Sequence, residues 1–458
     1  MSLKKVKRDE CIVFADLPPN PLSVSEIRKY KKLGFTAFVL TEDDVKFTVG
    51  GKITEEYKTA IKNVSDSGLD VIIRNMYNDE DYFDNPEPKK SSNYGSEYEI
   101  EKRSVTDEFS AFPRVVGFYA ADEPYMRTLK EMPWRWAHKD KEKFASFDKL
   151  VKIAEWKNKY YPEAFFHVNH VPSESYDHYF PSGNEIYDYA DFLTAYADKV
   201  LRKLDGGGRS LCLDSYPFVG EGYMESSYLK DLFTGATVTK KYNDSVSKEN
   251  FATFGICIQA FHAHSMKAEN EPRHRDIYSA AEITLQLYAG AALGAKLFEF
   301  FCYRSFCGRM EGIMRTDGTE RIYDIVKKAN DSALPLIKKV CKFSWTGGYC
   351  VGGSVFCDNA RAIIDAKSSF ERDEKIEVFS EYDLIVGRFK KGKKSGYMFV
   401  NYTDPSKNVK NKIRINGRFS KISVISDFGK KANFETDGRF ETELSTGGGI
   451  FVVIETGL

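Results

Sequence analysis

The sequence predicts an α/β protein, a (β/α)8 TIM barrel followed by a C-terminal antiparallel β-sandwich. Two observations predict the barrel: strand-like apolar runs alternate with helical patterns over about 330 residues, and carboxylates follow several of these runs. A third predicts the sandwich, because from about Ser344 the pattern changes to short alternating runs separated by Gly, Asn, Asp and Lys. We expect a barrel over residues 8–343 and a sandwich over residues 344–458.

Eight apolar runs are predicted strands of the barrel. They cover residues 11–17, 35–41, 69–76, 115–121, 164–170, 210–214, 254–261 and 296–303. Helical patterns lie between them at 23–33, 55–67, 98–109, 144–160, 185–204 and 275–293, and residues 219–250 are expected to form a loop with one helix. Gly34, Gly68 and Gly294 follow three of these helices as C-cap signals. No Gly-rich dinucleotide fingerprint follows the first strand, which disfavours a doubly wound nucleotide fold.

The C-terminal runs predict an all-β domain. They are residues 376–379, 384–389, 396–401, 422–426 and 450–454. We expect this domain to brace the barrel, with lectin-like binding as the alternative.

The composition and charge of the chain limit the classes of binding partner that can be expected. The chain has 458 residues, more than one core usually holds, and its 67 basic and 67 acidic side chains balance. This gives no reason to expect nucleic acid or a membrane as partner, and no apolar run reaches the ~20 residues of a membrane span. The first nine residues lack the apolar core of a signal peptide, which leaves localisation open between the cytoplasm and export after signal removal. Cys11, Cys212, Cys257 and Cys302 fall in predicted strands as buried thiols, and the cysteine spacing fits no metal site.

The fourth strand ends in two adjacent carboxylates, Asp122 and Glu123, followed by proline. Hydrolysis of a glycosidic bond needs two carboxyl groups at one site, and barrel enzymes place their chemistry at the carboxyl ends of strands. Glu123 shares strand parity with Tyr119 and Ala121, so without a bulge it points into the barrel mouth and Asp122 toward the helices. We therefore predict Glu123 as the general acid.

Several short stretches resemble one family of enzymes. They are residues 117–124, 167–172, 211–217, 255–261, 288–295, 298–303 and 316–324. In this order they resemble the barrel glycoside hydrolases of the clan related to β-galactosidases, above all uncharacterised members with Asp-Glu-Pro after strand four. The resemblance spans about three quarters of the chain and implies that Glu123 is the acid/base.

The second carboxylate is less clear. Retaining members of the clan carry a nucleophilic Glu after strand seven, whereas this chain has Gln259 there. Asp214 after strand six and Glu299 on strand eight are the two candidates. We rank Asp214 first, because the family-like run around it holds an Asp and the strand-eight position is usually neutral. Glu299 could instead face outward and pair with a helix.

Other polar and aromatic residues near strand ends are predicted to bind sugar. They are Asp16, Asp122, Trp134, Trp136, Asn169, His170, Tyr216, Gln259 and Tyr303. Trp134 and Trp136 lie in an insertion after strand four, where they either stack on sugar or pack the insertion onto the barrel. The run Arg273 to Arg275 is expected to form a solvated face with packing at a helix start, with binding of an acidic sugar as the alternative.

The predicted function is hydrolysis of an oligo- or polysaccharide without metal or cofactor. The partner is the carbohydrate substrate, and the oligomeric state is not predicted. One alternative is a non-catalytic carbohydrate-binding protein on a degenerate barrel, suggested by Gln259. Another is a metal-dependent barrel hydrolase using His167, His170 and His262.

Overall fold

The computed structural model describes most of the chain in two compact units. The described residues are 3–19, 22–41, 48–49, 52–74, 108–123, 147–173, 189–219, 223–224, 226–264, 272–305, 310–354 and 375–455. One unit contains residues 1–8, 12–214 and 241–253, and the other contains residues 9–11, 215–240 and 254–458. The predicted division of the chain after residue 343 remains a proposal.

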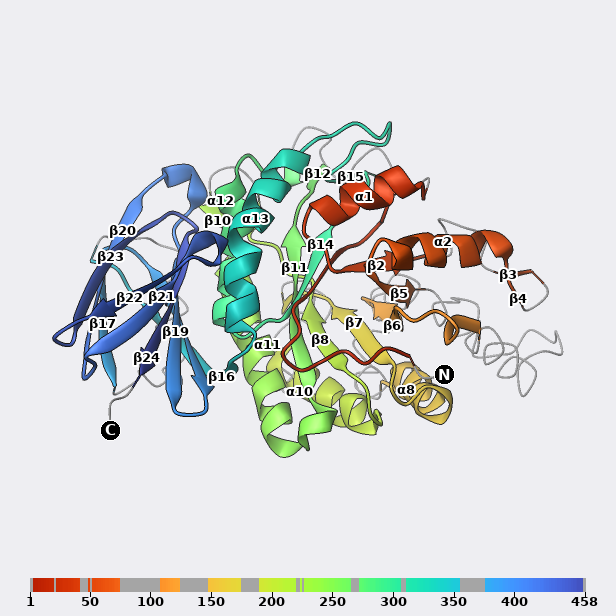
Figure 1. The fold of residues 1–458 in the computed structure, drawn as a ribbon, viewed down its shortest axis with the longest axis horizontal. Helices are drawn as coiled ribbons and strands as arrows, with labels where there is room; N and C mark the ends of the chain where they lie inside the picture. The colour runs from red at the N-terminus through yellow and green to blue at the C-terminus, as the bar shows by residue number, and fades with distance from the viewer. Residues whose placement is uncertain are drawn as a thin grey trace, which may run out of the picture. The chain divides into compact units, whose positions relative to one another are not determined.

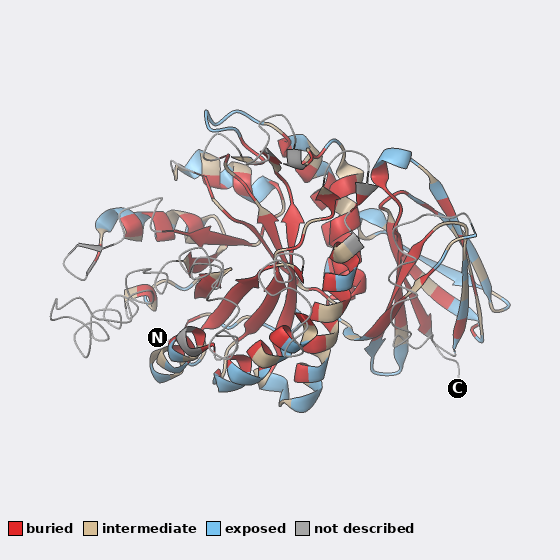
Figure 2. Ribbon diagram, turned by 180° about the vertical axis from the view of Figure 1, so that it is seen from behind, coloured by how far each residue is buried: buried red, intermediate tan, exposed pale blue. Residues whose placement is uncertain are grey.

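Eight strands form the barrel sheet in the order β1-β14-β11-β8-β7-β6-β5-β2 (Figure 1). They are β1 (Ile12–Ala15), β2 (Ala37–Leu40), β5 (Asp70–Arg74), β6 (Val115–Asp122), β7 (Phe165–His170), β8 (Arg209–Leu213), β11 (Ala252–Gln259) and β14 (Leu297–Phe301). Each of the eight predicted runs contains one of these strands in whole or in large part, so the predicted barrel is confirmed. The strands are almost wholly buried, as Figure 2 shows in red, which agrees with their unbroken apolar sequences.

Helices alternate with the strands in both units. They are α1 (Val24–Lys32), α2 (Glu55–Asp66), α8 (Asp148–Tyr160), α10 (Tyr189–Lys199), α11 (Ser226–Ser245), α12 (Ala280–Ala292) and α13 (Tyr323–Val340). Short 3-10 turns cover Leu201–Lys203, Lys248–Asn250, Pro405–Lys407 and Asp427–Gly429. Ser23 and Thr54 cap α1 and α2 by accepting hydrogen bonds from backbone N–H groups of the first turn. Among the described residues, no helix combines the length and apolar character needed to cross a membrane.

A second sheet, which the sequence did not predict, is built from short antiparallel strands in the order β10-β9-β13-β12-β15. These are β9 (Phe218–Val219), β10 (Tyr223–Met224), β12 (His262–His264), β13 (Pro272–His274) and β15 (Met310–Glu311). They come from the segments that follow β8, β11 and β14. A further pair, β3 (Thr48–Val49) and β4 (Lys52–Ile53), forms a small hairpin.

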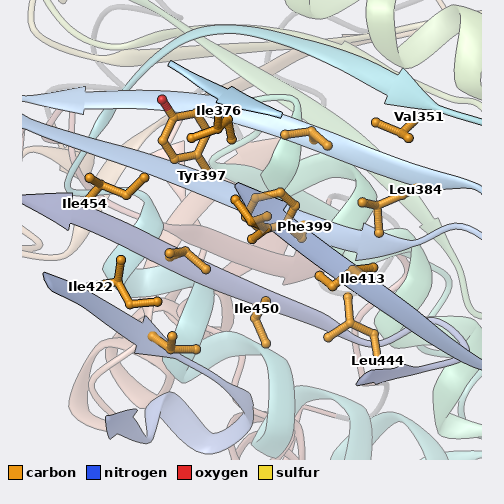
Figure 3. Packing of buried hydrophobic residues seen from close by; sticks show 14 of the residues in the cluster. Val351, Ile376, Leu384, Tyr397, Phe399, Ile413, Ile422, Leu444, Ile450 and Ile454 are labelled. Atoms are coloured by element: carbon orange, nitrogen blue, oxygen red, sulfur yellow. The ribbon is translucent and has the colours of Figure 1, made fainter. Parts of the chain in front are cut away.

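The C-terminal strands form two antiparallel sheets, as predicted. The six-stranded sheet holds β16 (Ser344–Val351), β18 (Leu384–Lys391), β19 (Lys394–Asn401), β24 (Gly449–Glu455), β21 (Lys421–Ile425) and β22 (Lys431–Glu435). The three-stranded sheet holds β17 (Ile376–Ser380), β20 (Lys410–Gly417) and β23 (Arg439–Ser445). Alternate residues of both sheets interdigitate in one apolar core (Figure 3).

The six-stranded sheet packs directly on α12. A Cβ added to Gly387 of β18 would lie 1.9 Å from the carbonyl oxygen of Ala292, so only glycine allows this approach. Trp345 of β16 donates from Nε1 to the same oxygen over 3.0 Å. These contacts fix α12 to the C-terminal strands within one unit.

Candidate active site

A charged network joins the carboxyl ends of β1, β5 and β6. Arg74, the last residue of β5, forms ion pairs with Asp16, which follows β1, and with Asp122, which ends β6. The distance from Arg74 Nη2 to Asp122 Oδ2 is 2.7 Å, and the guanidinium carbon lies 4.6 Å from the centre of the Tyr119 ring. Burial acts to lower the pKa of Arg74, but the charges of Asp16 and Asp122 outweigh it and raise that pKa. Arg74 is therefore a permanent cation between two carboxylates.

Asp122 accepts hydrogen bonds from three side chains. Besides Arg74, Tyr119 Oη donates to Asp122 Oδ1 over 3.1 Å, and Asn169 Nδ2 of β7 donates to the same oxygen over 3.1 Å. Three predicted site residues, Asp16, Asp122 and Asn169, are thus brought into one cluster. All three partners of Asp122 are donors, so its carboxylate acts as an acceptor that orders the cluster.

The orientation of Asp122 differs from our expectation. The pairing of β6 with β7 shifts register between Tyr119 and Ala121, so that Tyr119 pairs with His167 and Asp122 pairs with Asn169. Because of this bulge, Tyr119 and Asp122 lie on the same face although they are three residues apart. The expectation that Asp122 points toward the helices held only for a strand without a bulge, and with the bulge Asp122 shares the face of Tyr119.

The same face carries a buried layer below Asp122. His167 Nδ1 lies 2.7 Å from Ser210 Oγ of β8, and the His167 ring meets Phe14 of β1 edge-on at 5.5 Å. Since β1 and β7 are not neighbours in the sheet, this contact crosses the inside of the barrel. Burial lowers the pKa of His167 to about 3, so the imidazole is neutral at physiological pH. The ligand atoms of His167, Cys212 and Glu299 lie within 4.8 Å of one another in this layer, which is one layer deeper in the barrel than Asp122.

Glu123 and Asp214 lie beyond the Asp122 layer, toward the carboxyl ends of the strands. Asn169 pairs with Cys212 of β8, and Asp214 follows on the same face two residues later, half-buried. The Asp214 N–H donates to the carbonyl of His170 over 2.8 Å. Asp214 thus stands one layer above Asn169 and Asp122, close to the opening of the barrel.

Glu123 ends β6 with an unusual backbone. Its φ is +41°, in the left-handed region that residues other than glycine seldom adopt, and its N–H donates to the carbonyl of Asn169 over 3.0 Å. The side chain is half-buried. Because the residue leaves the extended conformation, strand parity no longer predicts its direction. Such strained residues concentrate at functional sites, where surrounding contacts hold them in place.

Glu299 faces the inside of the barrel and lies deep. Phe298, its neighbour in β14, faces α12, because a Cβ added to Gly290 of that helix would lie 3.3 Å from the Phe298 ring. Glu299 therefore points to the opposite face, which corrects the alternative that it pairs with an outer helix. It is 1% exposed and pairs with Cys257, one layer below the pair formed by Gln259 and Phe301. Glu299 is therefore fully buried and lies deeper in the barrel than the half-buried Asp214.

Gln259, the last residue of β11, is held by hydrogen bonds to backbone groups. Its Oε1 accepts from the Phe218 N–H over 3.0 Å, and its Nε2 donates to the carbonyls of Phe218 over 3.1 Å and of Arg275 over 3.0 Å. Both amide hydrogens are used and the side chain is 0% exposed. Gln259 therefore joins two loops of the second sheet instead of presenting an amide to a ligand.

Arg275 supports the same junction. Its guanidinium is buried, forms an ion pair with Glu282 and lies 4.5 Å from the centre of the Phe218 ring. Glu282 also accepts from the backbone N–H of Ser279 as part of the capping box that starts α12. The expected solvated face is wrong for Arg275, and the helix begins at Ala280 because the preceding residues form β13 and this buried ion pair.

Two predicted sugar ligands are buried away from any opening. His170 faces α10, where its ring packs 4.2 Å from the Tyr196 ring, and neither of its nitrogens has a hydrogen-bond partner among the described residues. Burial lowers its pKa to about 3. His167 and His170 lie on opposite faces of β7, so they do not share one metal ion. Tyr303 is also buried, in the segment after β14.

Tyr216 remains accessible. It is half-buried and packs edge-on against Phe261 at 4.8 Å and His274 at 5.5 Å, with Phe301 at 6.4 Å. These rings form an aromatic cluster above the ends of β11 and β14. Trp134 and Trp136 lie outside the described residues.

The sequence analysis missed Arg74, which organises the charged cluster. The signal was present, because an arginine near the end of the apolar run 69–76 must find a partner when the strand is buried. Tyr119 and Phe218 carried no comparable signal, since each reads as an ordinary aromatic core residue.

Comparisons with solved structures show that the chain has the fold of barrel glycoside hydrolases. It is similar to a family 39 glycoside hydrolase from the gut symbiont Bacteroides cellulosilyticus WH2, with a TM-score of 0.52 and 12% identity over 98% of this chain and 82% of that chain. It is also similar to a catalytic mutant of a GH42 beta-galactosidase from G. stearothermophilus, with a TM-score of 0.57 and 8% identity over 99% of this chain and 100% of that chain. No family model matches the chain, and a search of curated proteins found no match. The expected resemblance is thus confirmed at the level of the fold.

Proposed function

We propose that the protein is a glycoside hydrolase that cleaves an oligo- or polysaccharide, with Glu123 as proton donor. One observation carries the proposal: Glu123 and Asp214 follow the ends of β6 and β8, next to the ordered cluster around Asp122, in a chain with the fold of glycoside hydrolases. Protonation of the leaving oxygen and activation of water or attack at the sugar carbon need two such carboxyl groups.

The remaining residues have supporting roles in this proposal. Asp122 and Arg74 position the backbone from which Glu123 projects, and Asp16 balances the charge of Arg74. Asn169 holds Asp122 in place by donating a hydrogen bond to it. The half-buried Tyr216 offers a ring for stacking on the apolar face of a sugar.

Asp214 is our choice for the second carboxylate. Its strand, β8, is separated from β6 by β7 alone, and its backbone is tied to β7 at the same level as the turn into Glu123. Glu299 remains the second candidate. The variants Asp214→Asn and Glu299→Gln separate the two, because only the true partner should lose activity without losing stability.

Release of reducing sugar from a panel of plant and host glycans tests the proposal. Wild type and Glu123→Gln are compared with Glu155→Gln, an exposed carboxylate on α8. We expect release by wild type and by the control, and a loss of about 100-fold or more in Glu123→Gln. Release that survives in Glu123→Gln would remove Glu123 from the mechanism.

The second candidate function is a non-catalytic carbohydrate-binding protein. Gln259 favours it, because an amide cannot form the glycosyl ester that the retaining enzymes of the clan use. Sugar binding with no release by wild type on any glycan would support this alternative. In either case the proposed partner is a carbohydrate, and the C-terminal strands act as an accessory domain.

A further inference from the structure

A cavity of about 850 Å³ opens at one end of the C-terminal sandwich. It lies between β16, β19 and β24 of the six-stranded sheet and β17 and β20 of the three-stranded sheet. Its volume is within the range of pockets that hold small ligands, roughly 300–1,000 Å³. The cavity is open to solvent on one side, so a ligand can enter it from the surface.

The floor of the cavity is aromatic and aliphatic. Tyr349, Tyr397 and Phe419 line it together with Ile376 and Ile454. Figure 3 shows the Tyr397 ring beside Ile376 at the end of the cluster where Ile454 also lies. Rings with polar edges in such a floor suit a ligand that has one apolar face and a hydroxylated periphery.

The rim is polar and includes the charged residues Lys375, Glu377 and Arg418. Ile376 pairs with Gly417, so Lys375 and Arg418 flank the same end of the three-stranded sheet. The next pair is Glu377 and Asn416, with Asn416 Nδ2 donating to Glu377 Oε2 over 3.4 Å. Arg418 is exposed and forms no ion pair with any described residue. Its guanidinium is thus available for a bidentate contact with a carboxylate.

We propose that this cavity binds the end of a saccharide chain that carries an acidic sugar. The aromatic floor receives the apolar face of the ring, Asn416 and Ser395 bind hydroxyls, and Arg418 binds the carboxylate. The choice of a sugar over other anionic rings rests on the proposed function of the barrel. The site itself is independent of Glu123 and Asp214, since none of its lining residues belongs to the barrel strands.

Calorimetric titration of the full chain with two matched probes tests this site. The probes are an α-1,4-linked galacturonic acid trisaccharide and the neutral α-1,4-linked galactose trisaccharide. Both are titrated into Glu123→Gln, which prevents turnover, and into the same chain with either Arg418→Glu or Lys407→Ala. Lys407 is an exposed lysine of the same sandwich outside the cavity. Thermal unfolding of each variant checks that it is folded.

We expect the acidic probe to bind, with affinity reduced about tenfold or more by Arg418→Glu and unchanged by Lys407→Ala. The neutral probe should bind correspondingly more weakly and be insensitive to Arg418. Absence of binding, equal binding of both probes, or binding unaffected by Arg418→Glu would overturn the proposal. Failure of the barrel to release sugar from any glycan, with this binding pattern intact, would overturn the proposed hydrolase and leave the sandwich site standing.

Discussion

The carboxyl ends of β6 and β11 hold corresponding positions in the fold but differ in what their polar side chains contact. At the end of β6, Asp122 is held by side chains from β5, β6 and β7, and Glu123 follows it half-buried in a left-handed turn. At the end of β11, Gln259 is fully buried, and its side-chain amide is hydrogen-bonded to backbone groups of Phe218 and Arg275. A strand end is therefore a place where a polar residue can be expected, but the groups to which that residue is hydrogen-bonded determine whether it can act on a substrate.

Among the single substitutions, the largest loss of stability should follow removal of Arg74. The variant Arg74→Met removes the cation that lies between Asp16 and Asp122. Two carboxylates that are at least partly buried are then left without their ion-pair partner. We expect a loss of about 3–5 kcal/mol in the free energy of unfolding, measured by urea denaturation.

Arg114→Met is the matched control, because Arg114 pairs with Asp70 while 39% of its side chain is exposed. It should cost at most about 1 kcal/mol. Equal losses of unfolding free energy in the two variants would show that the Arg74 network stabilises the fold no more than a surface ion pair does.

A carboxylate placed at the end of β11 should not restore a nucleophile. In Gln259→Glu, an acceptor oxygen replaces the amide nitrogen and faces the carbonyls of Phe218 and Arg275. We expect a stability loss of about 1–3 kcal/mol and no gain in sugar release. A gain in release would mean that this end of the barrel, too, is open to substrate.

The two histidines of β7 should make the barrel acid-sensitive. Both have pKa values lowered to about 3 by burial, from 6.5. Below pH 6.5 the unfolded chain binds protons that the folded chain excludes, so stability present above pH 6.5 is lost as the pH falls toward 3. Each histidine should contribute a loss of about 1.4 kcal/mol per pH unit in that range.

His170→Phe isolates the outward-facing histidine. Its ring packs against Tyr196 and Phe192, which accept an apolar ring, so the variant should lose about half of the acid sensitivity in urea titrations between pH 6.5 and pH 4. An unchanged slope would show that His170 takes up a proton in the folded state.

The smallest effect should come from Tyr119→Phe. The variant removes the 3.1 Å hydrogen bond to Asp122 but keeps the ring under Arg74. We expect a loss of about 1 kcal/mol by urea denaturation. Tyr57→Phe, whose hydroxyl donates to a backbone carbonyl over 3.4 Å, should lose less, and the opposite order would contradict the ordering role of Asp122.

The barrel could be predicted because its strands are buried on both faces and appear as unbroken apolar runs. The bulge between Tyr119 and Ala121 could not be predicted, since neither Gly nor Pro stands at it and Gly117 of β6 lies before it. The expected direction of Asp122 assumed a strand without a bulge, so it does not apply. The hydrogen bonds of Gln259 could not be predicted either, because one of its partners, Phe218, is 41 residues away in the sequence. Contacts at that separation produce no local sequence pattern. Arg74 is an intermediate case. A charged residue in an apolar run indicates that it has a partner in the fold, but the sequence does not show which residue the partner is.

The account depends most on Glu123 as the proton donor. The direct measurement is cleavage by wild type and Glu123→Gln of two substrates of the same sugar, a natural glycan and a dinitrophenyl glycoside whose leaving group needs no proton. We predict a loss of about 100-fold or more on the glycan and a much smaller loss on the aryl glycoside. Equal losses on both substrates, or none on the glycan, would contradict the assignment.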